Sequence, residues 1–321
     1  MVFFFKPFSQ TYFLSLALFF LMKALAKTNF LGLEDERLYD FAKSRVVVQQ
    51  LPYEHTSSYL SGSVKGPDAI IKASAFVECY DEEIDREIVN DLGISTLEPL
   101  DFTDKVDADA VELIESQTTE LLNARKFIVS LGAEHTVTLG IAKAFVKKFP
   151  ELTILQIDAH SDLRQSYQGN IYSHASVMAR VHDLNVLICQ AGIRAQSKEE
   201  AQLIRESDLL HTFYAHQIRS NPFWMDELIA PMSNNVYITI DADGFDPSII
   251  PGVGTPEPNG LFWHETLRFL KKVCAERNVV GFDIVECAPI EGSILSEYTL
   301  AKLAYKLLGY RFAKNFKDKN S

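Results

Sequence analysis

Cysteine is scarce in this chain and offers no disulfide framework. The 321 residues include four cysteines, with no C-x-x-C pair and no short, regular spacing: Cys79, Cys189, Cys274 and Cys287. Small secreted domains that depend on disulfides carry more cysteines in tighter patterns. We therefore expect reduced thiols in a cytoplasmic protein.

Positive charge is also in short supply. Lysine and arginine number 31 against 43 aspartates and glutamates, which gives a net charge of −12. This balance argues against nucleic-acid binding and mildly favours a cationic ligand. The hydrophobic share of 47% and the charged share of 23% are typical of a globular protein with a full core.

The chain has no internal repeat, low-complexity tract or long Gly/Ser linker, so we expect a single domain over residues 23–321. Residues 1–22 form an apolar extension, with an apolar run at 12–22 and the sequence Ala-Leu-Ala at 24–26. The run suits a signal peptide and is short for a membrane span. Alternatively, Met22 is the true start. We expect no stable membrane association of the domain that follows.

Short apolar runs alternate with helical patterns along the rest of the chain. Five runs are typical of strands buried on both faces: 126–131, 152–158, 185–193, 235–241 and 278–285. Three segments between them have helical periodicity: 136–149, 197–207 and 264–276. This alternation predicts an α/β fold in which helices cover both faces of a parallel sheet.

Polar residues follow four of these strands directly, where an open parallel sheet places its ligand site. They are candidate metal ligands or substrate contacts: His135, Asp158, His160, Asp162, Asp241, Asp243 and Glu286. In an extended segment, residues two positions apart share a face, so the D-x-H-x-D run at 158–162 points three side chains into one space. The D-x-D run at 241–243 does the same.

Clustered carboxylates repel one another in a poorly solvated cleft unless cations compensate their charge. The set contains four aspartates, whereas His135 and His160 bind metals as neutral imidazoles. Two divalent ions neutralise four negative charges, so we expect a two-metal site. Oxygen and imidazole donors without thiolate favour Mn(II), with Fe, Co, Ni or Zn as substitutes.

The motifs also have simpler interpretations. A lone D-x-H-x-D run after a strand can be a surface turn or a helix cap. The run at 241–246 differs from a calcium loop, because Phe245 and Asp246 stand where an acidic or amide residue and a glycine are needed. The glycines at 252 and 254 lack the third glycine of a dinucleotide loop, where Glu257 stands.

Several segments resemble the ureohydrolases, the arginase and agmatinase family. They occur in the family's order over residues 29–312: PYEHTSSYLSGSVKGPDAI, GAEHTVTLG, DAHSDL, YSHA, TIDADGFDPSIIPGVGTPEPNGL and NVVGFDIVECAP. Ala133 and Asn259 stand where the family usually has glycine. Both departures leave every ligand type intact.

The resemblance implies a three-layer α/β/α sandwich around a parallel, about eight-stranded sheet, and two Mn(II) ions per subunit. It implies two ligand sets that share Asp158 and Asp241 as bridges: one with His135 and Asp162, the other with His160 and Asp243. A bridging water with a lowered pKa attacks the guanidinium carbon and releases urea. A homo-oligomer, trimer or hexamer, is also implied.

The resemblance gives further roles to three residues. Asp162 also orients the attacking hydroxide, His174 shuttles protons, and Glu286 pairs with the substrate guanidinium. A single-zinc deacetylase-like amidohydrolase and a non-catalytic relative are the alternatives. The unbroken set of six ligands argues against both.

The substrate that we expect is agmatine, cleaved to putrescine and urea. The run at 166–176 and Glu257 resemble the agmatinase branch, and these motifs carry no spare basic residue for the α-carboxylate of arginine. Asn170 is the counterargument, since it can serve as an arginase-type donor. Arginine, 4-guanidinobutyrate and formimino compounds are therefore the alternative substrates.

Overall fold

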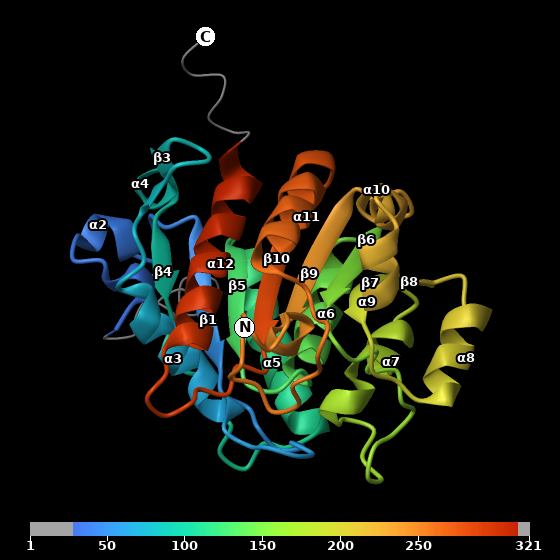
Figure 1. The fold of residues 1–321 in the computed structure, drawn as a ribbon. Coiled ribbons are helices and arrows are strands. Elements are labelled where there is room, and N and C mark those ends of the chain that lie inside the picture. Colours follow the sequence, from blue (N-terminus) through green and yellow to red (C-terminus); the bar gives the residue numbers. More distant parts are fainter. Residues whose placement is uncertain (1–27, 314–321) are drawn as a thin grey trace, which may run out of the picture.

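A computed structural model describes residues 28–313 and contains an eight-stranded, fully parallel sheet (Figure 1). Its strands, in spatial order, are: β4 (Ile94–Thr96), β1 (Val46–Leu51), β5 (Phe127–Gly132), β10 (Asn278–Val285), β9 (Asn235–Asp241), β6 (Leu152–Ile157), β7 (Leu187–Ile193) and β8 (Leu210–Tyr214). The apolar N-terminal extension at 1–22 lies outside the described residues.

The five predicted strands are all confirmed and correspond to β5, β6, β7, β9 and β10. They are apolar and almost completely buried, as strands covered on both faces must be. Three strands were not predicted. β4 has three residues, β8 is a half-exposed edge strand, and β1 contains two buried glutamines before its last residue, which break its apolar run.

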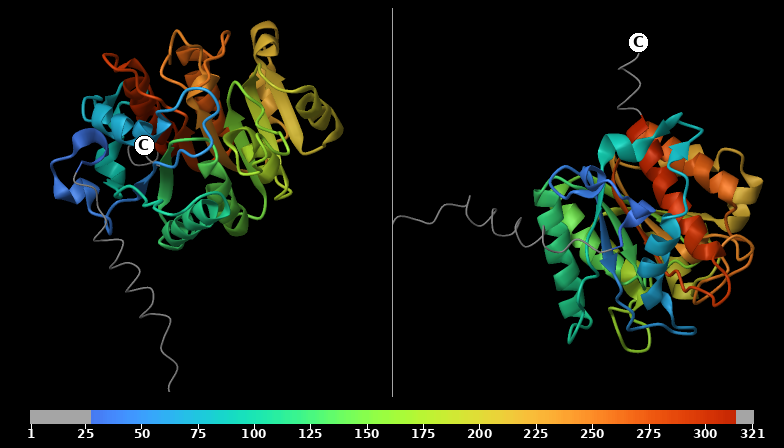
Figure 2. Two further views of the ribbon diagram at one scale, coloured as in Figure 1. Left: turned by 90° about the horizontal axis from the view of Figure 1, so that it is seen from below. Right: turned by 90° about the vertical axis from the view of Figure 1, so that its left-hand side faces the viewer.

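Helices cover both faces of the sheet, as the edge-on view of Figure 2 shows. One layer contains α3 (Gly66–Ser74), α9 (Ala215–Ser220), α10 (Trp224–Ile229), α11 (Trp263–Glu276) and α12 (Leu295–Phe312). The other contains α5 (Ala108–Asn123), α6 (Val137–Lys148), α7 (Val177–His182) and α8 (Lys198–Glu206). The predicted three-layer sandwich is therefore confirmed.

Shorter elements complete the fold. They are α2 (Glu36–Tyr39), α4 (Ile88–Leu92), a hairpin of β2 (Tyr80–Asp81) and β3 (Arg86–Glu87), and four 3-10 turns: η1 (Phe30–Gly32), η2 (Ser63–Lys65), η3 (His174–Ser176) and η4 (Ala242–Gly244). The predicted helices at 136–149, 197–207 and 264–276 are confirmed as α6, α8 and α11.

Two apolar clusters, one on each face of the sheet, hold the layers together. Side chains such as Ile154 and Ile238 are completely buried, and each contributes roughly 1.5–3 kcal/mol of hydrophobic stabilisation. The four cysteines form no disulfide. Within residues 28–313, every helix is too short or too polar to cross a lipid bilayer.

Candidate active site

The predicted ligands meet at the carboxyl ends of four neighbouring strands, β5, β10, β9 and β6. A cavity of about 210 Å³ opens there, which we call the active-site cavity. Eleven residues line it: Ser58, His160, Asp162, Arg164, Tyr167, His174, Ala175, Asp241, Asp243, Thr255 and Glu286. His135 and Asp158 are fully buried beside these residues.

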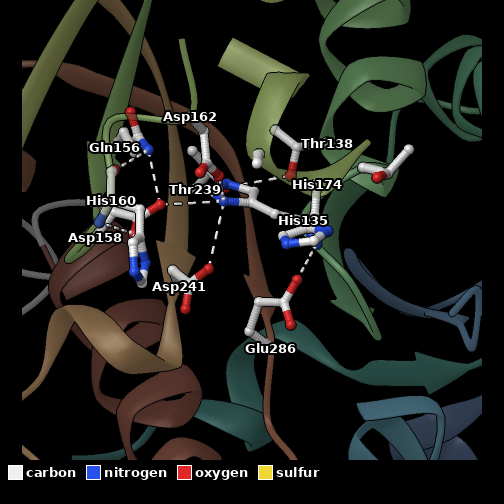
Figure 3. A network of polar contacts seen from close by, with 12 residues as sticks. His135, Thr138, Gln156, Asp158, His160, Asp162, His174, Thr239, Asp241 and Glu286 are labelled. Carbon is white, nitrogen blue, oxygen red and sulfur yellow. Dashed lines mark hydrogen bonds and ion pairs between the residues drawn. The ribbon is translucent and has the colours of Figure 1, made fainter. Parts of the chain in front are cut away.

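Three carboxylates surround one ring nitrogen of His135 (Figure 3). Its Nδ1 lies 3.0 Å from Asp162 Oδ2, 3.1 Å from Asp158 Oδ2 and 3.4 Å from Asp241 Oδ2. The atom is buried and makes no hydrogen bond. A polar atom in this position calls for a partner, because an unsatisfied buried nitrogen is costly.

The other ring nitrogen of His135 shows which partner is needed. Thr239 Oγ1 lies 2.9 Å from Nε2 and donates its hydrogen to Asp283 Oδ1 over 2.6 Å. Because a hydroxyl has one hydrogen, Thr239 accepts the Nε2 proton, and the lone pair of Nδ1 faces the carboxylates. The lone pair and the carboxylates repel one another unless a cation lies between them. These four donors therefore fit a metal ion.

A second donor group adjoins the first and shares Asp158 with it. His160 Nδ1 lies 3.0 Å from Asp243 Oδ2 and 3.8 Å from Asp158 Oδ1. The ligand atoms of these three residues lie close enough to hold one ion, as do those of His135, Asp158 and Asp241. The two adjoining donor groups share one carboxylate, Asp158, whereas the resemblance implies Asp241 as a second bridge.

Burial and mutual repulsion disturb the protonation of these groups. Burial, reinforced by the charges of Asp162 and Asp243, raises the pKa of Asp158 to about 7. Burial and the charges of Asp243 and Asp158 raise the pKa of Asp241. Although burial opposes it, the charge of Asp243 raises the pKa of His160 to about 11. Asp158 and Asp241 can therefore both be fully anionic at neutral pH only if a cation lies beside them.

Short backbone contacts hold the two acidic loops against each other. The backbone N–H of Ala159 donates to Asp243 Oδ1 at 3.2 Å, and that of His160 donates to Asp158 Oδ1 at 2.6 Å. A Cβ at position 244 would lie 2.8 Å from the backbone nitrogen of Asp158, so only Gly244 permits this approach.

Glu286 reaches the cavity from the end of β10. Its Oε1 accepts the backbone N–H of His135 at 2.6 Å, and its backbone has a left-handed φ of 61°. Burial raises its pKa, and the charge of Glu134 adds to the effect. With one oxygen held, the second remains for a planar cation such as guanidinium.

His174 also lines the cavity and lies between two hydroxyls. Its Nδ1 is 3.0 Å from Thr56 Oγ1, and its Nε2 is 3.1 Å from Ser58 Oγ. Thr56 Oγ1 also accepts the backbone N–H of His174, which fixes the start of this turn against the Thr56 loop.

Three charged residues that support the site were not predicted. Glu134 Oε2 accepts the backbone N–H groups of His55 and Thr56, and so places the loop that contacts His174. Glu200 Oε1 accepts from Ser161 and Leu163 and so holds the D-x-H-x-D run. The sequence predicts the capping box in which Glu200 takes part at the start of α8, but it does not predict the hydrogen bonds of Glu200 to Ser161 and Leu163.

Arg194, the third, lies just after β7. Its guanidinium donates to the backbone carbonyls of five residues, among them Asp243 at 2.6 Å and Glu257 at 2.8 Å. This fixes the loop after β9 against the loop that contains Thr255. No local pattern in the sequence announces such a contact.

Comparison with known proteins now identifies the family. The sequence model described as "Arginase family" matches residues 44–309. The chain belongs to the arginase family. This confirms the resemblance to ureohydrolases and makes the protein a hydrolase.

The relatives within the arginase family include enzymes with two different names. An N(1)-aminopropylagmatine ureohydrolase of Synechocystis sp. is 42% identical over 87% of this chain and 92% of its own length. An agmatinase of Bacillus cereus is 35% identical over 78% of this chain and 86% of its own. The crystal structure of an agmatine ureohydrolase of Thermoplasma volcanium is 28% identical with a TM-score of 0.76, covering 91% of this chain and 97% of that one.

Two residues near the cavity bear on the branch of the arginase family. Asn170 donates to Asp107 at 2.7 Å and accepts from the backbone of Tyr172, so both ends of its amide are already engaged. Arg164, which lies outside the motifs, also lines the cavity. It is 40% exposed, lies over the ring of Tyr167 and is 3.8 Å from the Glu200 carboxylate. Asp162 has a left-handed φ of 54°, so the chain turns at this residue, and the run at 158–162 is not extended throughout as predicted.

Proposed function

We propose that this arginase-family hydrolase cleaves guanidino amines to urea and an amine. The observation that carries the proposal is the shared position of Asp158 between two ion sites, with the Glu286 carboxylate in the same cavity. A planar cation held by Glu286 would lie beside both ion sites. Neither a single-ion site nor a simple binding pocket needs this arrangement.

The metals that we propose are two Mn(II) ions, since the donors are oxygens and imidazoles. His135, Asp158, Asp162 and Asp241 would hold one ion. Asp158, His160, Asp241 and Asp243 would hold the other. When bound, such a pair lowers the pKa of a water molecule toward neutrality and supplies the nucleophile.

The residues of the chain then bind, orient and move protons. Glu286 fixes the guanidinium so that its carbon faces the ion sites, and Asp162 accepts a hydrogen bond from the attacking oxygen. A carbon–oxygen bond forms at the guanidinium carbon, and the carbon–nitrogen bond to the alkyl chain breaks. The leaving amine takes a proton, which the Nε2 of His174 is placed to deliver from the cavity wall.

The substrate that we propose is a guanidino amine without an α-carboxylate. Asn170, the one arginase-type donor foreseen, is occupied by Asp107 and Tyr172 and does not line the cavity. Four carboxylates line that cavity, and Asp158 adjoins them. Two divalent ions would neutralise the four aspartates and leave Glu286 to attract a cationic ligand. Agmatine meets these conditions.

N(1)-Aminopropylagmatine is a second candidate with its own support. The 42% identical Synechocystis enzyme is named for it, and so are two Thermus thermophilus relatives that are 34–35% identical. An aminopropyl group at the amine end of agmatine leaves the guanidinium unchanged. The chemistry at the ion sites would therefore be the same, and the product would be a triamine instead of a diamine.

A substrate panel tests the proposal. We would compare kcat/KM for urea release from agmatine, N(1)-aminopropylagmatine, arginine and 4-guanidinobutyrate with the Mn(II)-loaded enzyme. One of the two amines should exceed both carboxylate-bearing compounds by at least about tenfold, a difference of roughly 1.4 kcal/mol. A value for arginine or 4-guanidinobutyrate equal to that of the better amine would contradict the proposal and point to Arg164 as a carboxylate ligand.

A further inference from the structure

A second hollow lies at the end of the sheet opposite the active-site cavity, around the amino ends of β1, β5 and β10. Its volume is about 280 Å³. Arg45 precedes β1, Lys126 precedes β5, and Asn278 begins β10, while Phe312 ends α12. Figure 1 shows the C-terminal end of α12, to which Phe312 belongs, at the top of the view. Strands of six residues separate the hollow from the active-site cavity by roughly 20 Å.

Cations dominate the lining of this basic hollow. Five of the eleven lining residues are basic and none is acidic: Arg45, Arg125, Lys126, Lys148 and Arg311. Such a concentration stands out in a chain with a net charge of −12. Within residues 28–313, no ion pair involves any of the five.

Two of these cations have structural partners. Lys126 Nζ donates to the backbone carbonyls of Phe41 and Ser44, the latter at 2.6 Å. Arg311 donates to Asn278 Oδ1 at 2.7 Å and to the carbonyl of Val279. They are positioned by neutral acceptors, which fix the side chains and leave their charge uncompensated.

The other cations have heads available for a ligand. Among the described residues, the side chains of Arg45, Arg125 and Lys148 make no hydrogen bond, and all three are exposed. The Arg45 guanidinium lies 4.5 Å from the centre of the Phe312 ring, and that of Arg311 lies 5.1 Å from the same ring. Burial lowers the pKa of Arg311, and the charge of Arg45 lowers it further, whereas Cys274 raises it. Two guanidinium groups therefore converge on one aromatic ring.

Compensation of helix dipoles accounts for only part of this charge. α5, α6 and α12 end beside the hollow, and the negative end of each helix is equivalent to about half a charge. Asp40, whose charge acts on Lys126, contributes one more. Against five cations, these terms leave an excess of roughly two to three positive charges.

We propose that the basic hollow binds a small dianion of the phosphate type. Guanidinium groups match the oxygens of a tetrahedral oxyanion, and the flexible lysine and arginine heads at the rim can close on it. The excess of positive charge matches, to within one unit, the magnitude of the negative charge on a phosphate dianion. The site is separate from the ion sites of the active-site cavity and does not depend on the proposed reaction.

Calorimetric titration of the metal-loaded protein with inorganic phosphate tests the proposal, at constant ionic strength. The double variant Arg45→Gln/Lys148→Gln removes two exposed charges without touching the hydrogen bonds of Lys126 and Arg311. The double variant Lys198→Gln/Arg205→Gln, on exposed positions of α8, is the control with the same net charge. Thermal unfolding and kcat/KM are recorded for all three proteins.

The wild type and the α8 control should bind phosphate alike, and Arg45→Gln/Lys148→Gln should bind it at least about tenfold more weakly with unchanged kcat/KM. Arg125→Gln, a single exposed change, should weaken binding in the same direction if the double variant proves unstable. Equal phosphate affinity in all the proteins would overturn the proposal and place the anion in the active-site cavity. No measurable binding to the wild type would overturn it as well.

Discussion

Thr239 donates a hydrogen bond of 2.6 Å to Asp283, a carboxylate that is completely buried beneath the active-site cavity. The oxygen of the same hydroxyl lies 2.9 Å from His135 Nε2 and accepts a hydrogen bond from its N–H. Asp283 also accepts hydrogen bonds from Tyr237 and Thr138 and is held on all sides. Through Thr239, this buried carboxylate fixes the ring orientation and tautomer of His135.

Thr239→Val should therefore weaken metal binding although Thr239 is not a metal ligand. The change removes the acceptor of Nε2–H, so the ring loses its fixed tautomer. We expect metal affinity to fall by about 10- to 100-fold, measured by competition with a chelator. Thr153→Val, which also removes a buried hydroxyl from a central strand, is the matched control. Equal metal affinity in the two variants would show that Thr239 does not orient His135.

Asp158→Asn should remove the carboxylate common to both ion sites. The amide keeps the volume of the side chain but loses the charge that two cations share. We expect fewer than two metal ions per chain by elemental analysis, and no measurable urea release. Retention of both ions with near-normal turnover would exclude Asp158 as a bridge.

Glu286→Gln should separate substrate binding from metal binding. Its oxygen can still accept the His135 N–H, but the charge that pairs with guanidinium is lost. We expect kcat/KM to fall by the equivalent of about 2 kcal/mol or more, with both metals in place. Loss of metal in this variant would instead make Glu286 a ligand.

A buried ion cluster far from the active-site cavity should make stability depend on acid pH. Lys306, 3% exposed, lies 2.7 Å from Glu83 and 3.0 Å from Asp81. Although burial opposes it, hydrogen bonds from Lys271, Lys306 and Tyr310 lower the pKa of Glu83 to about 2. A carboxyl group whose pKa is lower in the folded state stabilises the fold fully at pH values above its unfolded pKa. This stabilisation is lost as the pH falls from the unfolded pKa to the folded pKa.

The stabilising contribution of Glu83 should therefore be lost between pH 4.5, which is its unfolded pKa, and about pH 2. Across this pH range, the free energy of unfolding of the wild type should fall more steeply than that of Glu83→Gln, measured by urea denaturation. Glu112→Gln, at an exposed position of α5, should follow the wild type. Parallel slopes for the wild type and Glu83→Gln would show that the cluster does not contribute.

The central strands and their ligands were predictable because both depend on local patterns. Apolar runs such as 152–158 indicate buried central strands, and the rule that strand ends converge brings the polar residues after them together. The short β4 and the edge strand β8 lack such a pattern. Their pairing depends on neighbours that are remote in the sequence. The extended geometry expected for the two acidic runs was wrong, because β6 ends at Ile157, Asp162 has a left-handed φ of 54°, and Ala242–Gly244 form a 3-10 turn.

The supporting residues of the site escaped prediction for the same reason. Arg194 binds carbonyls about fifty residues away, and Glu134 binds a loop about eighty residues upstream. The sequence alone leaves Asn170 open as a substrate donor, whereas in the structure its amide donates to Asp107. The expected trimer or hexamer stays a prediction.

Titration of the metal-free protein with Mn(II) tests the central claim most directly. Urea release from the better guanidino amine should rise with added metal and level off at two equivalents per chain, because both ion sites must be filled to supply the nucleophile. Full activity at one equivalent, or urea release without any bound metal, would contradict the two-metal account.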